Sequence, residues 1–260
     1  VTVASGATFQ LGGSETVASI AGAGNYSLGA FTLTAGNDNT STTVSGNITG
    51  TGGKIEKRGT GTLTLSGNNS FTGDLQAWGG TVSLGSIGNV GQTSNAGAGN
   101  ISLGASTTSS GIVYTGTGET SNKTIDLAGR GTLTLNASGS GLLKFTSNFT
   151  STGPANKTLV LNGSGSGELA GAIADSASGS TALNATANSG NNTLALASLV
   201  GVATGASVSG NGGIPAGTTI LSINATASTI TLSSNLTGNI NSGTTVTITG
   251  VLNPTSITKS

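Results

Sequence analysis

Short runs of alternating apolar and polar residues, separated by turn residues, recur along this chain and constrain its fold more than any other feature. Within Gly59–Gly85 two such runs, Thr62–Ser66 and Thr81–Leu84, flank a third at Phe71–Trp78. A close variant of the first run returns at Gly131–Asn136. Alternation with a period of two is the pattern of a half-buried strand, and no segment shows a capped helical stripe. The sequence therefore predicts an all-β chain.

The similarity of these runs to one another bears on the type of all-β architecture. Units that recur at a spacing of roughly 20 residues favour stacked coils, each of which buries its inner face against its neighbours. The 46 glycines suit coil corners that need a positive φ or leave no room for a Cβ. A sandwich of conventional hairpins is the alternative. We expect a parallel β-helix, or solenoid, as the main part of the chain.

Charge is too scarce for several functional classes. Charged residues make up 6% of the chain, and the net charge is zero. Such a chain has no basic surface for nucleic-acid phosphates, and no apolar run approaches the roughly 20 residues of a membrane span. Cysteine is absent, which excludes disulfides and thiolate metal sites. We therefore expect no nucleic-acid partner and no membrane span. The lack of cysteine and charge favours an extracellular location at the cell surface.

The residues that carry most catalytic and metal chemistry are missing. Without His or Cys, no Ser-His, Cys-His or His-metal arrangement can form. The carboxylates stand singly in turn-like sequences, whereas glycoside hydrolysis needs two that face one another. Asp38 is the best calcium candidate, but one Asp in an Asn-rich turn is more typical of an Asx-turn. We predict a non-enzymatic protein with no cofactor and no metal. A polysaccharide lyase or hydrolase is the enzymatic alternative.

Three stretches resemble a known repeat, namely Gly12–Gly24, Ser45–Gly53 and Gly59–Gly85. They are similar to the autotransporter-associated β-strand repeat of bacterial surface and secreted proteins, and Leu169–Asp175 resembles the start of a further unit. The resemblance implies a right-handed β-helix that is exported to the cell surface as a non-catalytic passenger or stalk. A stalk within a longer autotransporter is one form of this hypothesis.

The last part of the chain differs from these repeats. Val208–Asn224, Thr229–Asn235 and Thr244–Thr249 resemble a small β-module of bacterial surface and phage structural proteins. Pro215 and Gly217 suit a turn, because proline fixes φ and glycine accepts a left-handed conformation. We therefore expect a second, smaller β-domain.

A boundary between the two parts is expected near residue 195, because Ala182–Asn192 is polar and shows no pattern. The sequence thus predicts a solenoid over residues 1–195 and a C-terminal β-module over residues 196–260. The chain begins at Val1 without a leader pattern, as a processed mature protein or an excised fragment would.

Two places in this architecture are candidates for contacts. Leu75 and Ala77 are expected to face inward, which turns Trp78 outward, where it can pack on a partner subunit or stack on a sugar. The alternative for Trp78 is local burial over its own coil. The N-terminal strand with Val1 and Val3 has no polar cap, and unpaired strand edges promote further pairing. Head-to-tail pairing of unlike ends need not close and would extend a filament.

These features favour a structural function. We expect an extracellular β-solenoid subunit of a bacterial surface fibre, filament or stalk that assembles head to tail with copies of itself. The alternative is a binding module, either a glycan-binding adhesin or a phage-fibre-like element. In that case Trp78 and nearby polar side chains would form the contact surface, and surface glycans would be the partner.

Overall fold

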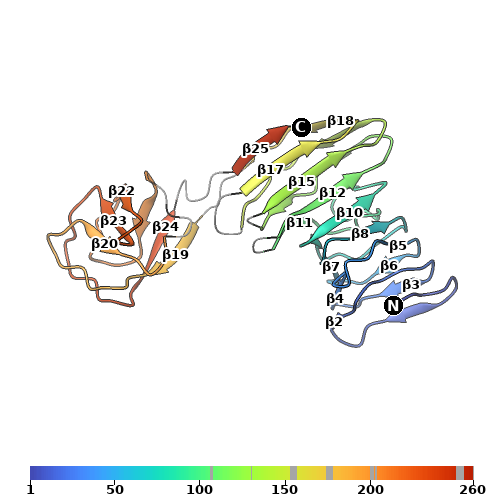
Figure 1. Cartoon of the computed structure of the whole chain (residues 1–260), viewed down its shortest axis with the longest axis horizontal. Helices are drawn as coiled ribbons and strands as arrows, with labels where there is room; N and C mark the ends of the chain where they lie inside the picture. The colour runs from blue at the N-terminus through green and yellow to red at the C-terminus, as the bar shows by residue number, and fades with distance from the viewer. Residues whose placement is uncertain are drawn as a thin grey trace. The chain divides into compact units, whose positions relative to one another are not determined.

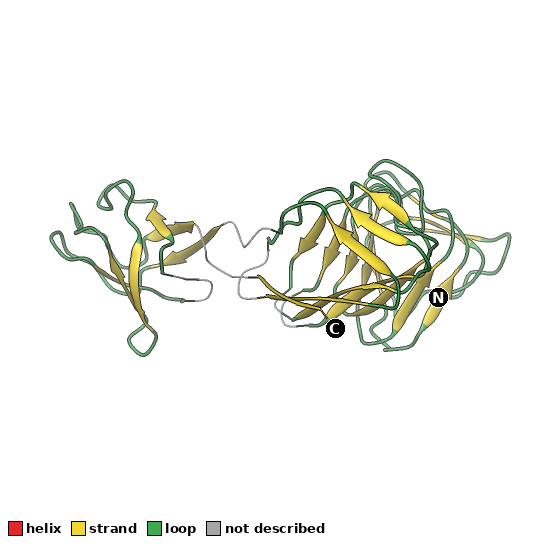
Figure 2. Cartoon of the chain, turned by 90° about the horizontal axis from the view of Figure 1, so that it is seen from above, coloured by secondary structure: helices red, strands yellow, loops and turns green. Residues whose placement is uncertain are grey.

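The computed structural model (Figure 1) describes residues 1–105, 108–129, 131–152, 157–173, 178–199, 202, 204–249 and 255–259. Within these residues the long regular elements are β-strands, and no helix is present (Figure 2). The all-β class expected from the alternation is therefore confirmed. This part of the chain contains no helix that is long and apolar enough to cross a membrane.

The chain folds into two compact units, which are described separately. The first is built from Val1–Gly153, Lys157–Ile173 and Ser256–Ser260, and the second from Pro154–Asn156 and Ala174–Thr255. The first unit thus gives way to the second after Ile173, earlier than the boundary expected near residue 195. The reason is that strands before residue 195 pair within the second unit.

The first unit contains nineteen of the described strands. Most are three to six residues long, as the spacing of the turn residues predicts. Their bounds are β1 (Thr8–Gln10), β2 (Glu15–Thr16), β3 (Asn25–Ser27), β4 (Thr32–Ala35), β5 (Thr42–Val44), β6 (Ile48–Thr49), β7 (Lys54–Lys57), β8 (Thr62–Leu65), β9 (Leu75–Ala77), β10 (Gly80–Leu84), β11 (Ile101–Leu103), β12 (Ser110–Tyr114), β13 (Glu119–Ser121), β14 (Ile125–Leu127), β15 (Thr132–Ala137), β16 (Leu142–Phe145), β17 (Lys157–Asn162), β18 (Ser166–Leu169) and β25 (Thr255–Lys259).

Parallel stacking turns these strands into a solenoid (Figure 1). β6, β7 and β8 form one coil with one strand in each of three sheets, and β13, β14 and β15 repeat this order. A seven-stranded sheet runs β25-β17-β15-β12-β10-β8-β5 and a six-stranded sheet runs β14-β11-β9-β7-β4-β2. Two three-stranded sheets, β1-β3-β6 and β13-β16-β18, form the third side. Neighbouring coils pair in parallel, so the solenoid is confirmed over the hairpin sandwich.

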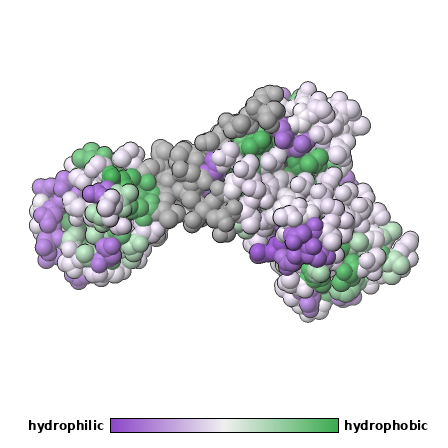
Figure 3. Space-filling view, in the orientation of Figure 1, coloured by the Kyte–Doolittle hydropathy of each residue, from purple (hydrophilic) through white to green (hydrophobic). Residues whose placement is uncertain are grey.

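Alternation places stacks of apolar side chains inside the coils. Leu65, Leu84 and Tyr114 lie in register on β8, β10 and β12, and each is at most 2% exposed. Burial of one such side chain contributes roughly 1.5–3 kcal/mol. The runs predicted at Thr62–Ser66 and Thr81–Leu84 are thus strands of one continuous core. Outward positions are mostly uncharged polar residues, so the face in Figure 3 is largely near-neutral in hydropathy, with strongly hydrophilic residues in a few patches.

Glycines let successive coils approach one another closely at a corner. A Cβ added to Gly46 would lie 1.9 Å from the carbonyl oxygen of Gly24. A Cβ added to Gly67, on the next coil, would lie 2.1 Å from the carbonyl oxygen of Gly46. Because the contact is with backbone, no side-chain rearrangement relieves it. Close stacking at this corner therefore requires glycine.

Three lysines of the described solenoid are buried, namely Lys57, Lys123 and Lys157, and the amines of the first two bind backbone carbonyl groups. Lys57 Nζ donates to the carbonyl oxygen of Gly79 on the next coil, at 3.3 Å. Lys123 Nζ donates to the carbonyl oxygens of Gly97, at 3.1 Å, and Gly99. Both side chains are at most 1% exposed. Burial lowers the pKa of both amines, and that of Lys123 falls to about 8.

We expect Lys123 to make the protein more stable as the pH rises above about 8. An unfolded lysine has a pKa of roughly 10.4, so between these values the unfolded chain binds more protons than the folded one. The free energy of unfolding then rises with pH, by up to ~1.4 kcal/mol per unit. Urea unfolding at several pH values should show this slope in the wild type and a smaller slope in Lys123→Met. Equal slopes in the two proteins would contradict the assignment.

The second unit consists of two antiparallel three-stranded sheets, β19-β24-β21 and β20-β23-β22. Ile230 and Val246 are fully buried between them. The turn predicted from Pro215 and Gly217 is present, because the Thr218 N–H donates to the Pro215 carbonyl oxygen at 3.3 Å and Gly217 has a φ of 78°. The strands are β19 (Ser178–Ala182), β20 (Thr193–Ala195), β21 (Ser207–Ser209), β22 (Ile220–Asn224), β23 (Thr229–Leu232) and β24 (Thr245–Thr249).

The last strand of the chain returns to the first unit. β25 lies beside β17 at the edge of the seven-stranded sheet, although the sequence assigned its residues to the C-terminal module. The second unit is therefore inserted between β18 and β25 of the solenoid. Thr255, the first residue of β25, is also the last residue of the second unit.

Candidate interaction sites

Trp78 directly follows β9, at the corner between the six-stranded and the seven-stranded sheet. Leu75 and Ala77 are fully buried, whereas Trp78 is half-buried, as an outward position would be. The preceding coil places Arg58 beside Trp78, because Lys57 is paired with Ala77 one position earlier. The backbone N–H of Trp78 donates to the Lys57 carbonyl oxygen at 2.9 Å, which fixes the backbone at this point.

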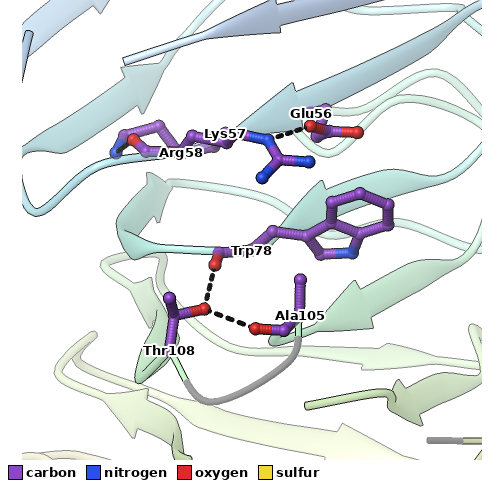
Figure 4. A network of polar contacts seen from close by, with 6 residues as sticks. All are labelled: Glu56, Lys57, Arg58, Trp78, Ala105 and Thr108. Atoms are coloured by element: carbon purple, nitrogen blue, oxygen red, sulfur yellow. Dashed lines mark hydrogen bonds and ion pairs between the residues drawn. The ribbon is translucent and has the colours of Figure 1, made fainter. Parts of the chain in front are cut away.

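Arg58 lies over the indole ring of Trp78, and Glu56 holds it there (Figure 4). Arg58 Cζ is 5.1 Å from the ring centroid, and Arg58 Nε donates to a carboxylate oxygen of Glu56. The Glu56 side chain is 8% exposed and that of Arg58 is 45% exposed. A cation–π contact at such an accessible position is worth ~0.5–1 kcal/mol. Together these contacts hold Trp78 in place.

The remaining polar contact of Trp78 also lies within the solenoid. Thr108 Oγ1 donates to the carbonyl oxygens of Trp78 and of Ala105 (Figure 4). Trp78 Nε1 is buried and has no hydrogen-bond partner. The ring position is thus determined by stacking and not by a hydrogen bond of the indole. Since Arg58 covers one ring face, a partner would have to bind elsewhere on the ring, and a contact through Trp78 stays a prediction.

We expect Arg58→Ala to expose Trp78 and to lower the free energy of unfolding by at least about 0.5–1 kcal/mol, because it removes the cation–π contact and leaves the mostly buried Glu56 carboxylate without its ion-pair partner. Trp78 is the only tryptophan, so its fluorescence reports on this site alone. The emission maximum should shift to longer wavelength and acrylamide quenching should increase. Lys54→Ala, at the start of β7, which ends just before Arg58, lies outside the stack and is the control. A spectrum of Arg58→Ala that matches the wild type would contradict the stack.

The N-terminal end of the solenoid contains Val1 and Val3, which the sequence proposed as contact residues. Val1 is 43% exposed, and its ammonium group donates to the Ser19 carbonyl oxygen at 2.6 Å. Val3 is buried in the first coil. The Tyr26 hydroxyl donates to the Ala21 carbonyl oxygen at 2.8 Å and closes this coil from inside. Val1 is therefore accessible to a partner at this end, whereas Val3 belongs to the core.

The other end of the solenoid has a hollow of about 420 Å³ that is lined mainly by apolar side chains and also by Asn162 and Glu168. Leu161, Leu169 and Ile173 are only partly buried there, although they pack on the same core that is fully covered in earlier coils. Sequence patterning did not reveal this hollow, because alternation does not distinguish a covered coil from a terminal one. The apolar side chains that line it are Leu135, Ala137, Leu143, Phe145, Leu161, Leu169 and Ile173.

Three carboxylates of the described solenoid, two of them on strands, accept hydrogen bonds from neighbouring segments of the chain. Asp38 Oδ1 accepts from the N–H (3.1 Å) and hydroxyl (2.8 Å) of Thr40, an Asx-turn, and the backbone bond lowers the pKa of Asp38. Glu119 accepts from the N–H groups of Ile87 and Gly88, at 2.6 and 2.9 Å. Among the described residues no three acidic side chains gather as a metal site would require.

Asp126 is the third of these acceptors. Its Oδ1 accepts from the Thr150 hydroxyl at 2.9 Å and from the Thr152 N–H at 3.0 Å. These bonds tie β14 to the chain of the next coil, which is a structural role.

Comparison with known proteins identifies the repeat. Residues 55–84 match the family described as Passenger-associated-transport-repeat. These residues contain β8, β9, β10 and all but the first residue of β7, which are stacked parallel strands of the solenoid. This part of the first unit therefore matches a passenger-associated repeat, and the resemblance seen in the sequence is confirmed.

The chain is also similar to the "Adhesin BmaC autotransporter" of Brucella suis biovar 1 (strain 1330). The two are 32% identical over 157 residues, which cover 57% of this chain and 5% of the adhesin. This chain thus spans a small fraction of the relative's length. The passenger repeat and this relative indicate a secreted or cell-surface protein. No solved structure matches the chain.

Proposed function

We propose that this chain is a non-enzymatic β-solenoid element of a secreted or surface-exposed adhesin-type protein, and that its solenoid associates end to end with copies of itself. The passenger repeat and the adhesin relative support the surface location and the non-enzymatic role. The hydrogen bonds accepted by Asp38, Glu119 and Asp126 also support the non-enzymatic role, because these carboxylates are engaged by donors of the same chain.

The single observation that carries end-to-end association is the apolar hollow after the last coil. Inside the solenoid, Leu84 is fully buried because a coil lies on each side of it. Leu161 and Leu169 also face inward, but beyond them only the single strand β25 follows, beside β17, instead of a whole coil, and both residues are partly exposed. Covering their apolar surface with another coil is favourable by roughly 25 cal/mol per Å².

The strand edges at the two ends favour the same arrangement. The sheet orders begin with β1, β2 and β5 at the N-terminal end and finish with β14, β18 and β25 at the other. Apart from isolated bridges, the outer edges of these strands have no partner strand in the described residues. Unpaired edges promote pairing with another chain. Because the two ends are unlike, their association is heterologous and can extend a filament.

We expect Leu161→Asp to abolish end-to-end association, because it places a charge in the apolar hollow. Val1→Asp, at the exposed start of the solenoid, should do the same from the opposite end. Sedimentation velocity over a range of concentrations should show growing assemblies for the wild type and single chains for each variant. Leu221→Asp, at an exposed leucine of the second unit, is the control and should assemble like the wild type.

Mixing the two variants separates this proposal from other modes of association. Leu161→Asp keeps an intact N-terminal end and Val1→Asp keeps an intact hollow, so an equimolar mixture should form dimers and nothing larger. Far-UV circular dichroism checks that each variant is folded. A wild type that stays a single chain at every concentration, or a mixture that forms no dimer, would overturn the proposal.

A further inference from the structure

The outward face of the seven-stranded sheet is hollowed at one position on β12. Ile112 faces inward between Val82 and Leu135, so the preceding residue, Gly111, faces outward. Its neighbours in register are Thr81 on β10 and Thr134 on β15. Both neighbours carry a side chain where Gly111 has none. A depression of about 320 Å³ lies over this position.

The depression is built into the backbone of the sheet. A Cβ added to Gly111 would lie 2.9 Å from both the Cβ and the carbonyl oxygen of Thr134. Glycine is therefore the residue that lets β12 and β15 keep this close approach. A glycine inside a strand often marks a place where a ligand or another backbone comes near. The same requirement that accommodates the neighbouring strand leaves no side chain at this position of the depression, where Gly111 itself is buried between its neighbours.

The polar groups on the side chains around the depression are hydroxyls and an amide, and none of the residues lining it is charged. The hydroxyls of Thr81, Thr132 and Thr134 make no hydrogen bond to any residue in the described part of the chain. Asn136 accepts a bond from the Ser138 hydroxyl at Oδ1, which leaves its amide N–H groups as donors. Each free hydroxyl can both donate and accept.

This chemistry fits one class of ligand. A neutral sugar offers hydroxyls that donate and accept, and its C–H groups can pack on the threonine methyls and on Val113, which also lines the depression. A phosphate, sulfate or carboxylate would find no cation there. We propose that the depression over Gly111 binds a neutral glycan.

The spacing of the lining groups suits an oligosaccharide. Thr81 and Thr134 stand on strands that flank β12, so they are separated by two strand spacings, roughly 9–10 Å. Along β15 the outward residues Thr132, Thr134 and Asn136 follow one another every ~7 Å. One sugar ring lies over Gly111 between the two threonines, and further rings continue along β15.

The proposal is tested with the full chain and an array of neutral oligosaccharides of glucose, galactose, mannose and N-acetylglucosamine. Heparin and sialylated glycans on the same array serve as charged probes. The wild type should bind at least one neutral glycan, and the Gly111 amide signal in NMR spectra should shift on titration. No binding to any neutral member, or preferential binding of heparin, would overturn the proposal.

Valine substitutions locate the site, because valine keeps the β-branched shape of threonine and replaces only its hydroxyl with a methyl group. Thr134→Val and Thr81→Val should each weaken binding on the order of 3–10-fold, the effect of one hydrogen bond. Thr64→Val is the matched control, since Thr64 faces outward on β8 of the same sheet but lies outside the depression. All three should keep the melting temperature of the wild type. Unchanged affinity in the Thr81→Val/Thr134→Val double variant, or an equal loss in Thr64→Val, would refute the site.

Discussion

Successive coils touch through their backbones at the glycine corners, and the rest of the solenoid depends on that contact. Gly46 and Gly67 stand where any Cβ would meet the carbonyl oxygen of the coil before. With the corners closed, the strands can lie at the ~4.8 Å spacing of a sheet. Only at this spacing do Leu65, Leu84 and Tyr114 stack into one dry core. A residue with a Cβ at such a corner would push the coils apart and separate the side chains that stack in the core.

The same geometry explains the scarcity of charge. In a parallel register each side chain stands over its counterpart one coil away, so repeated like charges would repel one another at close range. Uncharged threonine and serine avoid this cost. Some of the charges that do occur are compensated: Lys144 is in register with Glu168, and their charged atoms are 2.7 Å apart. Lys123 is buried, and its amine binds backbone carbonyl groups.

The strands and the solenoid could be predicted from the sequence, because alternation and repetition are local properties. Which residues lie next to one another on successive coils could not be predicted, since the coils differ in length. Val82 pairs with Leu63 on one side and Ile112 on the other, although the second connection is much longer. The partner of Trp78 and the depression over Gly111 depend on this register. The return of β25 to the solenoid had no sequence signal, because an inserted unit does not alter the alternation of the strand that follows it.

Inward-facing and outward-facing residues of this solenoid meet different structural requirements, and this difference affects where on its surface a function can arise. The inward residues must match the coils above and below, and the terminal ones, such as Leu161, leave apolar surface that only another coil-like surface covers well. Most outward residues have no such obligation, so a change there leaves the stack intact; Gly111 is an exception, because a Cβ there would meet Thr134 on the next strand. Trp78 and Gly111 are both departures from the surrounding polar rows. The proposed assembly therefore depends on the ends of the solenoid, whereas the proposed recognition depends on residues along its sides, most of which can vary without loss of the fold.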